Sequence, residues 1–311
     1  MFGISRQAYH KRLTKIQKLQ VQRAVILDLI KPIRKKMYRM GTIKIYDKIK
    51  NDMTQNNIKM GRDKLFEFLR NEKMLVAKKK NYTKTTNSFH YFYKYKNIVK
   101  DMEVNAPEQV WVSDITYIDT EAGNGFLSLI TDYYSKKIVG YHLADNLKTE
   151  GTLKALEMAI KSRKYPETPL IHHSDRGIQY CSYAYIQKLT ENNIKPSMTE
   201  NSDPYENAIA ERVNGILKDE FDIADGFINH IQAVKEISYA INTYNSFRPH
   251  FSCNMRLLTK LTLMEHTRSK NGADEDCTTK LIALNLKGYS DNFLEHFLVL
   301  KKLSEITKRT N

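Results

Sequence analysis

The chain has 311 residues, of which 41% are hydrophobic and 27% charged, the ordinary profile of a globular protein with room for more than one domain. No apolar run reaches the roughly 20 residues of a membrane span, and the N-terminus lacks the apolar segment of a signal peptide, so we expect a cytoplasmic protein with no membrane partner. Its three cysteines, Cys181, Cys253 and Cys277, are odd in number and far apart, which argues against a disulfide framework or a zinc site.

The net charge of +15 is unevenly distributed along the chain. Residues 1–105 contain 26 Lys and Arg against 8 Asp and Glu, whereas residues 106–311 contain 24 against 27. Such polarity predicts an N-terminal region that binds a polyanion, with nucleic acid the favoured partner, joined to a nearly neutral body. A solvated lysine-rich surface is the alternative.

The N-terminal region, residues 1–77, is predicted to be helical. Four helices are expected: a short basic helix capped by Ser5 and reaching Arg12, a second at about 21–39, a third from Thr42 to about Met53, and a fourth over 61–70. The last two have the spacing of a helix-turn-helix, whose second helix would bring Arg62 and Lys64 to DNA. A plain helical bundle is the alternative interpretation.

Residues 78–105 are predicted to form a basic, aromatic linker. Cations such as Lys78, Lys79 and Lys80 alternate with aromatic rings farther along the segment. Basic groups neutralise phosphates and aromatic faces stack on exposed bases, so the segment is predicted to touch DNA. Packing of the rings against the core is the alternative.

Residues 106–266 have the pattern of an α/β catalytic core. Strands are expected at 109–118, 126–131, 137–144, around Leu170 and at 195–199, and helices at 149–163 and 183–192. Three antiparallel strands followed by alternating helices and strands match the ribonuclease H topology.

A further helix is predicted to run to about Asp219, with Asp203 as N-cap, Pro204 at its first position and Glu206 completing a capping box. Asn207, Glu211, Asn214 and Lys218 share one of its faces, which we expect to point away from the core.

Three carboxylates stand out in this body. Asp114 lies within the first strand, Asp175 follows a later strand, and Glu211 comes 35 intervening residues after Asp175. Each has a structural explanation on its own, but clustered carboxylates repel unless a cation lies among them, and Mg²⁺ prefers such oxygen ligands. Two ions would suit in-line displacement at phosphorus.

Several motifs resemble the OrfB-type transposases of the insertion-sequence three (IS-three) family, which share the retroviral-integrase core. They are Trp111–Tyr117, His173–Tyr180, the 35-residue gap to Glu211, Lys218 seven residues later, and Tyr244–His250. The resemblance implies an Asp-Asp-Glu triad at Asp114, Asp175 and Glu211, with two Mg²⁺ or Mn²⁺ ions as cofactor. The predicted DNA contacts in the motifs are Arg176, Gln179, Asn207, Lys218 and Arg248.

The resemblance also implies partners and an order of events. Hydrolysis would free a 3′-hydroxyl at a terminal inverted repeat, and that hydroxyl would attack target DNA, often through a circular intermediate. We expect a nucleoid-associated homo-oligomer, with an upstream-frame (OrfA) protein as partner or frameshift fusion.

The chain departs from the family pattern in three places: Glu206 replaces an Asp, the segment around 252–260 is degraded, and residues 267–311 form a divergent tail. These departures motivate a second hypothesis, a decayed transposase that only binds DNA. A ribonuclease H-like nuclease acting on hybrids or junctions is a third.

Overall fold

The computed structural model describes residues 5–76, 91–121, 123–200, 204–253, 255 and 257–258. The predictions for Lys78, Lys79 and Lys80, for Cys277 and for the tail 267–311 lie outside these residues. Within them, no helix is long and apolar enough to span a bilayer.

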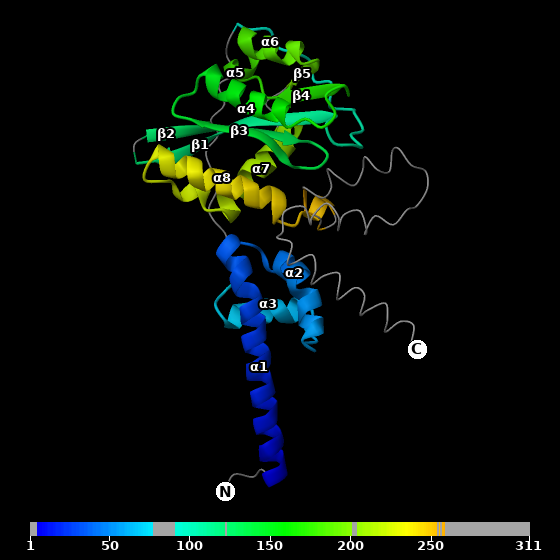
Figure 1. The fold of residues 1–311 in the computed structure, drawn as a ribbon, viewed down its shortest axis with the longest axis vertical. Coiled ribbons are helices and arrows are strands. Elements are labelled where there is room, and N and C mark those ends of the chain that lie inside the picture. The colour runs from blue at the N-terminus through cyan, green and yellow to red at the C-terminus, as the bar shows by residue number, and fades with distance from the viewer. Residues whose placement is uncertain are drawn as a thin grey trace, which may run out of the picture. The chain divides into compact units, whose positions relative to one another are not determined.

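The N-terminal region contains three helices, α1 (Arg6–Lys36), α2 (Thr42–Gln55) and α3 (Arg62–Asn71) (Figure 1). They bury a common apolar core that includes Ile26, Ile30, Ile45, Ile49 and Leu65. The cap predicted at Ser5 is confirmed, because its Oγ accepts a hydrogen bond from the backbone of Ala8 at 3.2 Å. The two helices predicted before residue 40 were wrong as separate elements. They form one helix of 31 residues, since residues 13–20 contain neither Gly nor Pro to break it.

The body is built on a five-stranded sheet with the order β3-β2-β1-β4-β5. Its strands are β1 (Val110–Thr120), β2 (Gly123–Asp132), β3 (Ile138–Ala144), β4 (Leu170–Ser174) and β5 (Ile194–Met198). The first three strands pair antiparallel, and β4 pairs parallel with both β1 and β5. The predicted ribonuclease H topology is therefore confirmed.

Helices cover both faces of this sheet (Figure 1). On one face lie α4 (Thr149–Lys161), α5 (Ile178–Cys181) and α6 (Tyr183–Glu191), and on the other lie α7 (Ala208–Glu220) and α8 (His230–Ser246). Three short 3₁₀ turns, Pro204–Asn207, Ile223–Asp225 and Phe251–Cys253, complete the described elements. Side chains alternate along β1, so Trp111 packs on the α4 side and Val112 on the α7 side.

Residues 91–105 approach the body without forming a strand. Phe92 and Tyr95 pack against the core beneath α4, whereas Tyr91 and Tyr93 are 90% and 72% exposed. Two rings of this aromatic segment therefore pack against the core and two are accessible to solvent, and contact of the segment with DNA stays a prediction.

Helix α4 lies unusually close to β3 at Gly140. A Cβ added there would lie 2.2 Å from the carbonyl oxygen of Ala155 and 2.8 Å from the Cβ of Ala159. Because the first of these neighbours is backbone, α4 itself would have to move to make room.

We predict that Gly140→Ala lowers the free energy of unfolding by about 1–3 kcal/mol, the usual cost of overpacking. Gly215→Ala is the matched control, since nothing lies within 4 Å of the added Cβ inside α7. It should raise stability by about 0.5–1 kcal/mol through helix propensity. Urea unfolding of both variants checks the prediction, and equal effects would contradict it.

Candidate active site

The parallel pairing of β1 with β4 brings two of the three predicted carboxylates together. The last pair in the register is Ser113 with Ser174, and the two aspartates come directly after it: Asp114 continues β1, and Asp175 is the first residue after β4. Neighbouring strands lie about 4.8 Å apart. Asp114 shares its face of the strand with Val110 and Val112, which pack against the first turns of α7.

Helix α7 is hydrogen-bonded to this edge of β1 at two points. Asn207 donates from Nδ2 to the carbonyl oxygen of Ser113 at 3.0 Å, and Asn214 donates from Nδ2 to Oδ2 of Asp114 at 2.7 Å. Glu211 stands four residues after the first amide and three before the second, so it shares their face. The prediction that this face points to solvent was wrong for the two asparagines, which are buried, although Glu211 itself is exposed.

The start of α7 differs from the predicted capping box. A 3₁₀ turn over Pro204–Asn207 precedes the helix, which begins at Ala208, and Asp203 lies outside the described residues. The Glu206 carboxylate accepts a hydrogen bond from the backbone of Glu200 at 2.6 Å. It therefore ties the incoming loop to the turn before the helix begins.

The environment of Asp114 disfavours its charge. Burial raises the pKa of Asp114 to about 7, and the neighbouring charge of Asp175 adds to this effect. Glu211 also raises the pKa, by the smallest contribution, while hydrogen bonds from Ile115 and Asn214 act in the opposite direction. Three carboxylates therefore sense one another here, and a bound cation would relieve their repulsion.

Asp175 is held by the turn that follows β4. Its Oδ1 accepts from the backbone of Gly177 at 3.0 Å, and a Cβ on Gly177 would come within 3.0 Å of that same oxygen. Gln179, one turn on, is buried and donates to the carbonyl oxygen of Leu147 at 2.8 Å. The His173–Tyr180 motif thus shapes the loop around the carboxylate.

The predicted DNA contacts fall into three groups. Asn207, Gln179 and Arg248 are buried and bonded within the protein, and their assignment as DNA contacts stays a prediction. Their polar side chains satisfy backbone or carboxylate groups that the sequence pattern does not reveal.

The second group is half-buried near the carboxylates and consists of Arg176 and Lys218. Burial lowers the pKa of Lys218, while Asp119 and Asp114 oppose the shift. The third group, Arg62 and Lys64, is exposed on α3.

A neutral polar layer lies on the opposite face of the sheet from Asp114. His172 Nε2 lies 2.6 Å from the Ser113 hydroxyl and 2.9 Å from that of Tyr185, all three being buried. Burial lowers the pKa of His172 to about 3, with a further contribution from His173. This imidazole is therefore uncharged at neutral pH and supports β1 beside Asp114.

The donor chemistry suits a hard divalent cation, because carboxylate oxygens are the ligands that Mg²⁺ and Mn²⁺ prefer. Among the described residues, no three His, Cys, Asp or Glu side chains are gathered closely enough to hold an ion together. Asp114 and Asp175 are the neighbouring pair, and Glu211 is the third candidate ligand.

Comparison with known proteins finds related domains and proteins. Two models described as integrase core domain match residues 104–204 and 192–257. An uncharacterised 31 kDa protein of insertion element IS600 from Shigella sonnei is 33% identical over 254 residues, covering 80% of this chain and 92% of that protein. Transposase InsF of IS3A from Escherichia coli is 32% identical over 50% of this chain and 54% of its own length. The magnesium-bound HTLV-2 integrase core aligns with TM-score 0.41 and 19% identity, over 50% of this chain and 97% of that one.

The fold and the matched domain define an integrase-like core of the ribonuclease H class. The chain belongs to the IS-three family of insertion-sequence transposases.

The sequence analysis did not identify Asn214 as a contact of Asp114. Its signal was its place three residues after Glu211 on the same helical face.

Acid should destabilise the protein in part through His172. The pKa of the His172 imidazole is about 6.5 in the unfolded chain and about 3 in the folded protein. Below pH 6.5 the unfolded state therefore binds a proton that the native state does not. The free energy of unfolding should therefore fall as pH falls from 6.5 towards 3. In His172→Gln the slope between pH 6 and 4 should be shallower by up to about 1.4 kcal/mol per pH unit. Urea unfolding at several pH values measures it. The exposed His10→Gln serves as control, and parallel curves for wild type and His172→Gln would contradict the assignment.

Proposed function

We propose that this transposase cleaves DNA at the ends of its own insertion sequence and transfers the freed strand to a new phosphodiester. Asp114, Asp175 and Glu211 are the catalytic carboxylates. The observation that carries the proposal is the placement of Asp114 directly beside Asp175, with α7 bonded to the same point of β1.

The three carboxylates would hold Mg²⁺ or Mn²⁺, and we propose two ions. When bound, such ions activate an attacking oxygen and stabilise the leaving one during in-line displacement at phosphorus. The contribution of this chain is to fix the ligands: Gly177 orients Asp175, and Asn214 holds one oxygen of Asp114. Lys218, two turns after Glu211 on the same face, would contact a phosphate near the scissile bond.

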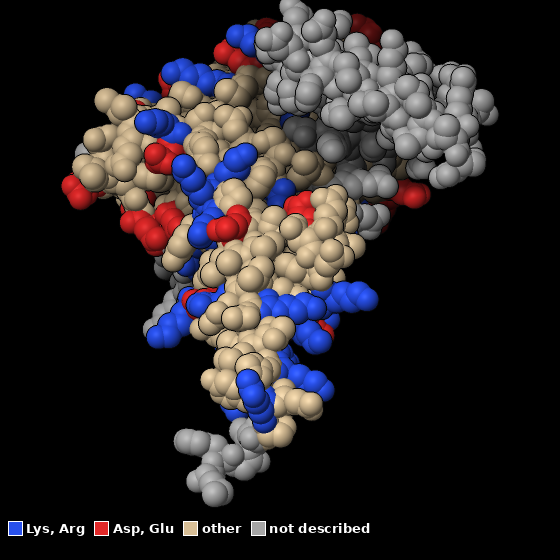
Figure 2. All heavy atoms as spheres, turned by 60° about the horizontal axis from the view of Figure 1, so that its bottom comes forward, with Lys and Arg blue, Asp and Glu red and all other residues tan. Residues whose placement is uncertain are grey.

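The N-terminal helices supply a second contact with DNA in this proposal. Helix α1 has no Asp or Glu before Asp28, and Figure 2 shows Lys and Arg side chains along it. Arg62 and Lys64 are exposed at the start of α3, the second helix of the predicted helix-turn-helix, and Lys78, Lys79 and Lys80 follow in the chain. The DNA partners are the terminal inverted repeats and the target duplex. Joining two ends requires a homo-oligomer, and an OrfA partner or fusion would add end recognition.

The first test is cleavage and joining of labelled element ends by the purified protein with Mn²⁺ or Mg²⁺. Asp114→Asn, Asp175→Asn and Glu211→Gln should each lower the rate by about 100-fold or more, because each removes a charged ligand of the proposed metal ions. End binding in a mobility-shift assay should persist. Glu150→Gln, at an exposed carboxylate in the first turn of α4, is the control for Glu211→Gln.

Full activity in any triad variant would refute that residue's assignment. If the wild-type chain shifts the ends but neither cuts nor joins them, the DNA-binding hypothesis replaces this one. Preference for an RNA/DNA hybrid over the element ends would instead favour a ribonuclease H-like nuclease.

The second test concerns the helix-turn-helix. Each phosphate contact that is lost reduces the slope of log affinity against log salt by about 0.9. The double variant Arg62→Gln with Lys64→Gln should therefore bind more weakly and with a slope shallower by about 1–2. Lys31→Gln, an exposed cation that pairs with Asp28 on α1, should leave the slope unchanged. An unchanged slope in the double variant would exclude these two residues as phosphate contacts.

A further inference from the structure

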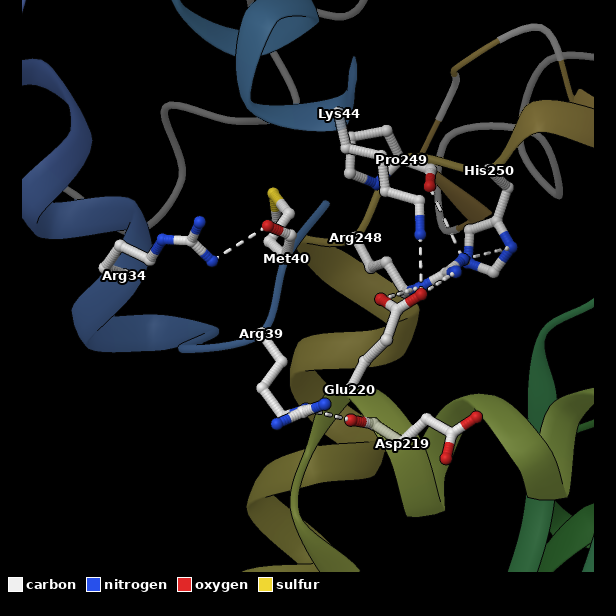
Figure 3. Close-up of polar contacts among 9 residues, drawn as sticks. All are labelled: Arg34, Arg39, Met40, Lys44, Asp219, Glu220, Arg248, Pro249 and His250. Carbon is white, nitrogen blue, oxygen red and sulfur yellow. Dashed lines mark hydrogen bonds and ion pairs between the residues drawn. The ribbon is translucent and has the colours of Figure 1, made fainter. Parts of the chain in front are cut away.

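The C-terminal end of α7 is joined to the N-terminal helices by a buried group of charges (Figure 3). Glu220, the last residue of α7, accepts two hydrogen bonds from Arg248, Nε to Oε2 at 2.7 Å and Nη2 to Oε1 at 2.6 Å. Lys44 of α2 donates from Nζ to Oε1 of the same carboxylate at 2.7 Å. Lys44 and Arg248 are 5% and 3% exposed, so these two cations are shielded from solvent.

Neighbouring contacts extend the same junction. Arg39, between α1 and α2, donates from Nε to the carbonyl oxygen of Asp219 at 2.7 Å and pairs with Asp222 at 3.6 Å (Figure 3). Lys48 of α2 lies 3.7 Å from the centre of the Phe247 ring, which follows α8. Hydrogen bonds, ion pairs and a cation–π contact therefore join the C-terminal end of α7 and the residue after α8 to the N-terminal helices.

The fold does not need Lys44 in order to satisfy the Glu220 carboxylate. Arg248 already bonds both oxygens of Glu220, so the carboxylate is satisfied without the lysine. Burial lowers the pKa of Lys44 to about 8, and repulsion from Arg248 lowers it further, while the charge and the hydrogen bond of Glu220 oppose the shift. Charges held at such a cost are often retained to specify an arrangement of elements rather than to strengthen the fold.

The arrangement that Lys44 specifies concerns the catalytic helix. Glu211 and Glu220 belong to the same unbroken helix and are nine residues, or about 14 Å, apart along its axis. A packed helix moves as a unit, so a shift at Glu220 is carried to Glu211. Asn207 and Asn214 bond the first half of α7 to β1, and Lys44 holds its last turn together with Arg248 and Arg39.

We propose that Lys44, acting through Glu220, is a positioning residue that sets where Glu211 lies opposite Asp114, so that strand cleavage depends on the docked N-terminal helices. This inference rests on the proposed function, in which Glu211 is catalytic. It assigns the contacts between α2 and α7 a role in the rate of the chemical step, separate from the affinity for DNA.

The test uses the full-length chain carrying Lys44→Met, which keeps the length of the side chain and removes its charge. At saturating element ends the cleavage rate should fall by about 10- to 100-fold, the cost of misplacing a reacting group by about 1 Å. The dissociation constant for the ends should stay within twofold, and the melting temperature should stay the same or rise. Lys44→Arg, which preserves the charge, should recover most of the rate.

The matched control is Lys50→Met on the same helix, where the lysine is exposed and pairs only with Asp47 among the ion pairs described. It should match wild type in all three measurements. A Lys44→Met protein that cleaves at the wild-type rate would overturn the proposal. So would weaker end binding with an unchanged saturated rate, which would make Lys44 a DNA contact, or a rate loss explained entirely by a lower folded fraction.

Hydrogen exchange separates this inference from the proposed function. Amides at 208–212, around Glu211, should exchange faster in Lys44→Met than in Lys50→Met, without DNA or metal. If the wild-type chain cleaves nothing, the proposed function fails while this comparison still decides the inference. Equal exchange rates in the two variants would overturn it.

Discussion

The candidate active site depends on an electrostatic conflict between Asp114 and Asp175, which the parallel pairing of β1 with β4 places side by side. Partial burial makes the conflict worse, and the pKa of Asp114 near 7 reflects it. A fold retains such a pair only if its remaining contacts are strong enough to offset the repulsion. The apolar cores on both faces of the sheet and the amide bonds from α7 meet that requirement.

Much of the sheet could be predicted from the sequence because alternation and turn residues are local signals. The five strands and their topology followed from them. The prediction divided the long helix α1 in two because local signals in the sequence mark where a helix starts more clearly than they show that it continues. The polar face of α7 was found, but periodicity cannot say whether a polar face meets water or a carboxylate. Only the structure shows Asn214 bonded to Asp114.

Charged side chains were the hardest to assign, because their partners are distant in sequence. Arg248 belongs to a recognisable motif and was expected at DNA, yet it is buried against Glu220, 28 residues earlier. Lys44 is one of many cations in a basic region, and nothing local marks it as buried. A surface lysine and an interface lysine have the same signature in sequence, and burial alone distinguishes them.

The alternation of side chains between the two faces of β1 determines what a misfolded chain can do. Asp114 faces α7, whereas the preceding Ser113 faces the neutral layer of His172 and Tyr185. A strand shifted by one residue would exchange these faces, driving a carboxylate among buried rings and leaving a hydroxyl in its place. A misregistered chain would thus lack the acidic cluster altogether. For the proposed transposase, errors of folding would then produce an inert protein rather than an indiscriminate nuclease.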